Sequence, residues 1–172
     1  MNRAHARVEI VKSWMDPVMV LQIVSPAFSD GGRIPRNHSC DGADRSPPLS
    51  WSGLPEGCLS LVLLCDDPDA PAGTWHHWAA YDIPAGETGL DEDFPKSESV
   101  GPIRQALNDF RRIGYSGPCP PRGHGPHHYR FRLLALSVEH LGLPARPNCR
   151  NVERAAVPHR IAEAMLVGIY ER

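Results

Sequence analysis

Prolines and glycines interrupt this chain so often that long helices are excluded from most of it. The 172 residues include 18 prolines and 15 glycines. Each proline fixes its own φ and removes a backbone donor, which breaks a helix interior. Short strands joined by long loops tolerate such interruptions better than a helical bundle does. The sequence therefore predicts a mostly β structure, and its length suits a single domain.

Apolar runs between these breaks predict where the strands lie. The run 59–65 is nearly all apolar, as expected for a central strand covered on both faces. Alternation in 129–137 predicts that Tyr129, Phe131, Leu133 and Ala135 share one face of a strand. Further strands are expected over 18–24, 77–83 and 165–170.

Helices are expected only near the C-terminus. The composition of 150–156 favours a short helix, for which Asn151 is a candidate N-cap. Pro158 cannot lie inside the same straight helix without cost, so a second helix is predicted to begin near it and to end by residue 164. The stretches 25–50 and 84–113 are expected to be loops, and residues 1–17 a poorly ordered leader before a domain over 18–172.

The net charge and the N-terminal sequence limit the functions and locations that this chain can have. The net charge is −2 and no basic stripe is present, so a nucleic-acid partner is not expected. The N-terminal segment lacks a clean secretory signal, and no apolar run approaches the ~18 residues of a membrane span. We therefore expect a cytoplasmic protein with no transmembrane segment, although peripheral contact with a membrane stays open.

Five cysteines show neither a disulfide framework nor metal-ligand spacing. Reduced thiols are expected in a cytosolic protein. Cys40 and Cys119 both lie in turn-rich segments that can converge. A metal pair or a redox bridge between them is therefore a second interpretation.

Two separate segments share an unusual chemistry. The first is DDPDAP at 66–71, followed by WHHW at 75–78. The second is GYSGPCPP at 114–121, followed by HGPHHY at 124–129. Together they hold five of the nine histidines. Both segments lie at expected strand ends, where loops on a rigid sheet commonly carry function. If the fold brings them together, their meeting point is the predicted site.

The residue types in these segments suit a small anion pocket. Prolines stiffen the 66–71 turn, so a carboxylate there can orient a histidine at little entropic cost. Of Asp67 and Asp69, one is expected to do this and the other to cap backbone amides. Only one of His76 and His77 can face a given pocket, because neighbouring strand residues point to opposite faces. Imidazole N–H groups, the Tyr129 hydroxyl and amides of the 115–118 turn would hold the anion.

Other chemistries fit the sequence less well. The histidine spacing matches no known zinc signature, so no metal is expected. GYSGP lacks the last glycine and the helix of a nucleophile elbow, which makes Ser116 a turn residue. Cys119 is a nucleophile only if it lies near His127, and an inert thiol is the favoured interpretation. No phosphate loop or dinucleotide motif is present, and no cofactor is expected.

The two motifs are long, and together they indicate a family. DPDAP…HHW with GYSGPCPP…GPHHY resembles the phosphatidylethanolamine-binding protein family, and especially its bacterial Raf-kinase-inhibitor-like branch. SPAFSDGGRIP at 25–35, CDGADRSPPLSW at 40–51 and LVGIY at 166–170 extend the likeness to roughly 20–172. The resemblance implies a β-sandwich with a large central sheet, a smaller second sheet and a few peripheral helices.

The resemblance also implies a ligand site. The implied ligand-binding residues are Asp67, Asp69, His77, Gly117, Pro118, His127, Tyr129 and Trp51. His128 stands where the family often has arginine, and we expect it to face away from the pocket.

The ligand class implied is a phosphate-bearing or similar small anion, such as a phospholipid head group, bound by a regulatory binding protein. Two alternatives remain open. One is an acid–base isomerase, cyclase or hydrolase that uses Asp67, His77, His127 and Tyr129. The other is a kinase or protease regulator that acts by protein contact. A homodimer is a further expectation from relatives.

Overall fold

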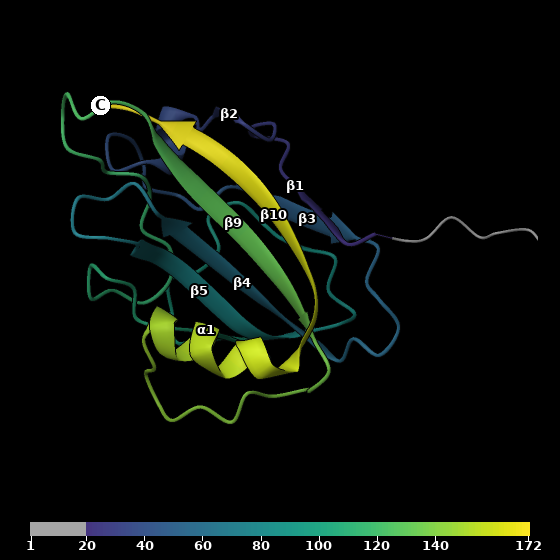
Figure 1. Cartoon of the computed structure of the whole chain (residues 1–172). Helices are drawn as coiled ribbons and strands as arrows, with labels where there is room; N and C mark the ends of the chain where they lie inside the picture. Colours follow the sequence, from purple (N-terminus) through teal and green to yellow (C-terminus); the bar gives the residue numbers. More distant parts are fainter. Residues whose placement is uncertain (1–19) are drawn as a thin grey trace, which may run out of the picture.

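The computed structural model describes residues 20–172 (Figure 1). The leader predicted over 1–17 falls outside this range. Two sheets, one short α-helix and two single 3₁₀ turns make up the regular structure of the described residues. The predicted mostly β fold, with a large and a small sheet, is confirmed.

The larger sheet has seven strands in the order β2-β10-β9-β4-β5-β8-β7. Its long strands are β4 (Ser60–Asp67), β5 (Trp75–Pro84), β9 (His127–Leu136) and β10 (Arg160–Tyr170). Its short strands are β2 (Gly32–Arg33), β7 (Ser99–Val100) and β8 (Ile103–Gln105). All neighbours are antiparallel except β2 and β10, which run parallel. β4 is central, as its apolar run predicts, and all eight of its residues are buried.

The smaller sheet has three strands in the order β1-β3-β6. They are β1 (Gln22–Val24), β3 (Leu49–Ser52) and β6 (Gly89–Leu90). β3 alternates buried and exposed residues, because one face packs toward the large sheet and the other meets solvent. Strands β6, β7 and β8 lie in the stretch 84–113, and β2 with the 3₁₀ turn η1 (Arg36–His38) lies in 25–50. These two stretches are therefore less irregular than predicted.

The core has two layers, one on each face of the large sheet. Between the sheets, Leu61, Leu63, Trp78 and Phe131 are completely shielded from solvent. The predicted face of β9 is confirmed, since Tyr129, Phe131, Leu133 and Ala135 all belong to this layer. The opposite layer joins the sheet to the helix α1 (Cys149–Ala156), which packs against β5 and β4.

The C-terminal segment differs from the prediction. Asn148, not Asn151, is the N-cap of α1, and the side chain of Asn151 bonds back to the Asn148 amide. The prediction of a second helix is wrong, because the 3₁₀ turn η2 (Val157–His159) leads directly into β10. Residues 162–170 pair continuously with β9, and Leu166 on β10 is buried between the sheets. Pairing and burial override the helical composition of this stretch.

The expectation of reduced thiols is also corrected. A disulfide joins Cys40 to Cys119 across 79 positions. The two loops that carry these residues are also bonded through the Cys40 amide and the Pro118 carbonyl, 3.1 Å apart. Cys58, Cys65 and Cys149 remain free thiols. No helix within 20–172 has the length and apolar character needed to cross a bilayer.

Candidate functional site

Antiparallel pairing brings the two motif segments to one end of the large sheet. β4 ends at Asp67, and its neighbours β5 and β9 begin at Trp75 and His127. The end of one strand therefore lies beside the start of both neighbours. Figure 1 shows the three strands side by side, with β4 between β5 and β9. The meeting point predicted from the sequence thus exists.

A cavity of about 310 Å³ opens at this meeting point. Its polar lining consists of Asp67, Trp75, His77, His127 and Tyr129. Its apolar wall is formed by Ala70, Pro71, Ala72, Phe110, Cys119, Pro120 and Pro121.

Asp67 holds His127 in place. Its Oδ2 accepts from Nδ1 of His127 at 2.7 Å, and its Oδ1 accepts from the Asp69 amide at 2.9 Å. Both residues are almost fully buried. Both carboxylate oxygens accept from protein donors, and through Oδ2 Asp67 fixes the orientation of the imidazole. This is the orienting role predicted for one of the two aspartates.

The ring of His77, which also lines the cavity, is bonded to a backbone carbonyl and not to a carboxylate. Its Nδ1 donates to the Ser116 carbonyl at 2.6 Å, a geometry that requires the proton on this nitrogen. Burial lowers the pKa of His77 below its ordinary value, so the ring is neutral at pH 7. Its Nε2 therefore carries a lone pair and acts as a hydrogen-bond acceptor.

Two further polar groups in the cavity lack a protein partner. The Tyr129 hydroxyl and the Trp75 indole N–H are buried, and within 20–172 neither forms a hydrogen bond with protein. Burial and then the nearby Asp67 carboxylate raise the pKa of Tyr129 well above its ordinary value, so the hydroxyl stays protonated. Buried polar groups are almost always bonded in native proteins. These two groups are consequently ready donors for a ligand.

His76 points to the opposite face of the sheet. Its ring nitrogens lie 3.3 Å from Asp109 and 3.3 Å from Glu153 of α1. The prediction that only one histidine of the pair faces the pocket therefore agrees with the structure, which places His77 there and His76 under the helix.

Four residues expected at the site lie outside the cavity lining. Asp69 accepts from the amide and the ring of exposed His128. Trp51 packs between the sheets, and its indole donates to the Glu87 carbonyl. Gly117 and Pro118 pack against the 38–44 loop instead.

The packing of Gly117 explains its placement. Its amide donates to Oδ1 of Asp44 at 2.6 Å, and a Cβ here would collide with the His38 carbonyl oxygen. The Ser116 amide bonds the His77 carbonyl at 3.1 Å. The amides of residues 116 and 117 are thus engaged within the protein and do not form the anion-binding turn that the sequence suggested.

Trp75 and Phe110 are pocket residues that the sequence prediction omitted. Trp75 could have been predicted from the sequence, because residues 75 and 77 of one strand share a face. Phe110 comes from an irregular loop and carries no local signal. Its ring packs edge-on against Trp75 and His77, with centroids 5.4 and 5.3 Å away.

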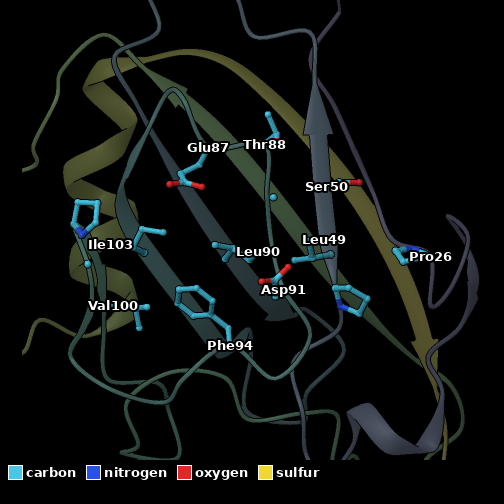
Figure 2. Close-up of a pocket in the computed structure, with 14 residues that line it drawn as sticks. Pro26, Leu49, Ser50, Glu87, Thr88, Leu90, Asp91, Phe94, Val100 and Ile103 are labelled. Carbon is cyan, nitrogen blue, oxygen red and sulfur yellow. The ribbon is translucent and has the colours of Figure 1, made fainter.

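A larger cavity of about 650 Å³ lies elsewhere, beside β3, β6 and the β7–β8 turn (Figure 2). Its wall is apolar, with Leu90, Phe94 and Ile103, and its charged groups are the carboxylates of Glu87 and Asp91. Among residues 20–172, no histidine, cysteine or cationic side chain lines it. Those carboxylates would repel an anion, so the smaller cavity is the better candidate site.

Comparison with known proteins decides the family. A family model described as phosphatidylethanolamine-binding protein matches residues 24–171. The chain belongs to this family. Among solved structures of the phosphatidylethanolamine-binding protein family, that of Escherichia coli YbcL is similar, with a TM-score of 0.82 and 34% identity over 88% of this chain and 98% of that one.

Two further relatives extend the comparison. The structure of a phosphatidylethanolamine-binding protein homologue, CT736 of Chlamydia trachomatis, has a TM-score of 0.79 and 37% identity over 90% of this chain and 99% of that one. The UPF0098 protein of Aquifex aeolicus is 49% identical over 153 residues, which cover 89% of this chain and 90% of that protein. The family resemblance read from the sequence is thereby confirmed.

Proposed function

We propose that the protein binds a small phosphate-bearing molecule, of the kind that forms a phospholipid head group, in the cavity between Asp67 and Phe110. One observation carries this proposal. The Tyr129 hydroxyl and the Trp75 indole N–H are buried in the cavity, and neither has a partner among residues 20–172. An oxyanion that accepts from both would satisfy them, and it would regain the free energy lost by leaving buried donors unpaired.

The remaining groups refine the ligand class. Asp67 engages Nδ1 of His127, which leaves Nε2 as the nitrogen of this ring that can bond a ligand. The neutral His77 ring adds an acceptor. A ligand with both an oxyanion and a donor fits this set. A phosphomonoester that retains one P–OH proton, or phosphorylethanolamine with its ammonium group, meets that description.

Isothermal titration calorimetry tests the proposal. Phosphorylethanolamine and inorganic phosphate are titrated into the wild type and into His127→Ala. Measurable binding by the wild type, with at least a tenfold loss in the variant, supports the assignment. Equal binding by both proteins, or none by either, refutes it.

An acid–base enzyme is the second candidate function. The observation that favours it is the buried carboxylate–imidazole pair of Asp67 and His127, the arrangement of many general bases. Phosphorus NMR of a bound phosphomonoester distinguishes the two candidates. A binding protein leaves the ester signal unchanged for hours, whereas a hydrolase converts it to free phosphate at a rate that Asp67→Asn lowers.

The cellular setting remains a prediction. A cytoplasmic location was expected from the sequence, but the Cys40–Cys119 disulfide favours an oxidising compartment, because cytosolic thiols are kept reduced. The homodimer, the protein-contact regulator and the absence of a nucleic-acid partner likewise stay predictions.

A further inference from the structure

Nε2 of His127, the ring nitrogen that Asp67 leaves free, contacts another residue of the chain. Nδ1 of His124 lies 2.7 Å from Nε2 of His127, and the two ring centroids are 5.0 Å apart. Nδ1 of His127 is taken by Asp67, also at 2.7 Å. Both nitrogens of the buried imidazole are therefore engaged by protein groups.

This contact holds in either protonation state of His127. In the neutral ring, Nδ1 donates to Asp67 and Nε2 accepts from Nδ1–H of His124. In the protonated ring, Nε2 donates to a bare Nδ1 of His124. In both cases a ligand oxygen cannot bond Nε2 of His127 until the His124 ring leaves.

The side chain of His124 has room to rotate away, while the Gly123 and His124 amides hold the backbone to the carbonyls of Arg172 and Pro121. His124 is exposed, whereas His127 is almost fully buried. Gly123 and Gly125 flank it with φ values of +73° and +88°, and beyond their chain neighbours no atom of residues 20–172 lies within 4 Å of the position of a Cβ on either glycine. Within the described chain, the side chain of His124 has one hydrogen-bond partner, the ring of His127. The hydrogen bond to His127 is thus the one side-chain hydrogen bond in the described chain that must break for this ring to leave.

We propose that His124 is an internal cap of the phosphate site, competing with the ligand for Nε2 of His127. This inference rests on the proposed function and adds a way to regulate it. The cap satisfies a buried imidazole nitrogen in the free protein, and the ligand must break that hydrogen bond on entry. The apparent affinity for phosphate is lowered by the free energy of the contact.

Calorimetry with inorganic phosphate and phosphorylethanolamine tests the cap. His124→Ala removes the competing ring, and His128→Ala is the matched control, because His128 is an exposed histidine of the same segment that bonds Asp69 instead. A net hydrogen-bond contribution of usual size predicts about two- to tenfold tighter binding by His124→Ala. The control should bind like the wild type.

A second measurement examines the contact without any ligand. In protein with ¹⁵N-labelled histidine, the hydrogen bond gives a ¹⁵N–¹⁵N coupling between the rings of His124 and His127. We expect this coupling in the free wild type, its persistence in His128→Ala, and its loss when saturating phosphate is added.

The outcomes separate the two proposals. Coupling in the free protein with weaker or unchanged binding by His124→Ala overturns the cap but leaves the phosphate site standing. No coupling in the free wild type also overturns the cap. Failure of wild type and His124→Ala alike to bind either probe refutes the phosphate site, and the cap falls with it.

Discussion

The carboxylate of Asp67 lies 2.7 Å from Nδ1 of His127, although 60 positions separate the two residues. The antiparallel pairing of β4 with β9 creates this contact, because it sets the last residue of one strand near the first residue of the other. The pair links the fold to its proposed function, since the same register that builds the core also orients the imidazole.

Replacing Asp67 with asparagine should weaken phosphate binding by about tenfold or more. The amide is uncharged, so it loses the charge-assisted hydrogen bond that fixes the His127 ring, and a tenfold loss equals about 1.4 kcal/mol. Calorimetric titration of phosphorylethanolamine measures the effect. Asp69→Asn is the control, because Asp69 bonds His128 outside the cavity, and it should bind normally. Equal losses in both variants would contradict the assignment of Asp67.

Removing the Tyr129 hydroxyl should separate stability from binding. Because this hydroxyl has no partner in the described part of the chain, Tyr129→Phe should leave the free energy of unfolding unchanged or raise it by about 1 kcal/mol. The same change should lower phosphate affinity about tenfold, since one donor is lost. Urea denaturation and calorimetry provide the two measurements.

Tyr115→Phe is the matched comparison. Tyr115 is equally buried, but its hydroxyl donates to the His38 carbonyl at 2.6 Å. Its loss leaves a buried acceptor unpaired and should cost about 1–3 kcal/mol of stability. A destabilised Tyr129→Phe with unchanged affinity would mean that the Tyr129 hydroxyl has a structural role only.

Loss of the Cys40–Cys119 disulfide should destabilise the fold. The bond closes a loop across 79 positions, for which chain entropy predicts up to about 4.5 kcal/mol, and measured effects are commonly about 2–4 kcal/mol. Urea denaturation of the wild type with and without a reducing agent measures this change. The double variant Cys40→Ala, Cys119→Ala should have the free energy of unfolding of the reduced wild type, and the reducing agent should not change it. If the reducing agent lowers the stability of this double variant equally, the effect does not come from this bond.

The contact of His76 with Glu153 should give the stability a pH dependence. The hydrogen bond from His76, with help from Arg132, lowers the pKa of Glu153 to about 2. Its contribution is therefore complete above the ordinary value of 4.5 and is lost as pH falls toward 2. Burial lowers the pKa of His76, but Glu153 and Asp109 outweigh it and the net change is upward. The His76 contribution is complete below 6.5 and is lost as pH rises through the raised pKa.

Urea denaturation from pH 2 to pH 9 tests this expectation. The wild type should be most stable between about pH 4.5 and 6.5, and Glu153→Gln should lose on the order of 2–3 kcal/mol there. The control is Glu171→Gln, because Glu171 is exposed and forms no ion pair in the described chain. A profile for Glu153→Gln that parallels the wild type at every pH would contradict this account.

Particular strands show what the local sequence pattern can and cannot predict. The apolar run at the start of β4 predicts a central strand because only a strand covered on both faces can hide it. Alternation in β9 identifies its core face because side chains of a strand alternate strictly. By contrast, residues 160–164 have helical composition yet form β10, since the free energy of pairing with β9 is invisible to the sequence of that segment alone.

The sequence by itself determined the central strands β4 and β9, the family and the two segments that meet at the site, because these depend on local periodicity and on motifs within one stretch of chain. The tertiary structure alone decided that Cys40 bonds Cys119, that His77 rather than His76 enters the cavity, and that Gly117 packs against His38. It also placed His124 over His127. These are relations between distant segments or between strand faces, and strand register and close packing set them.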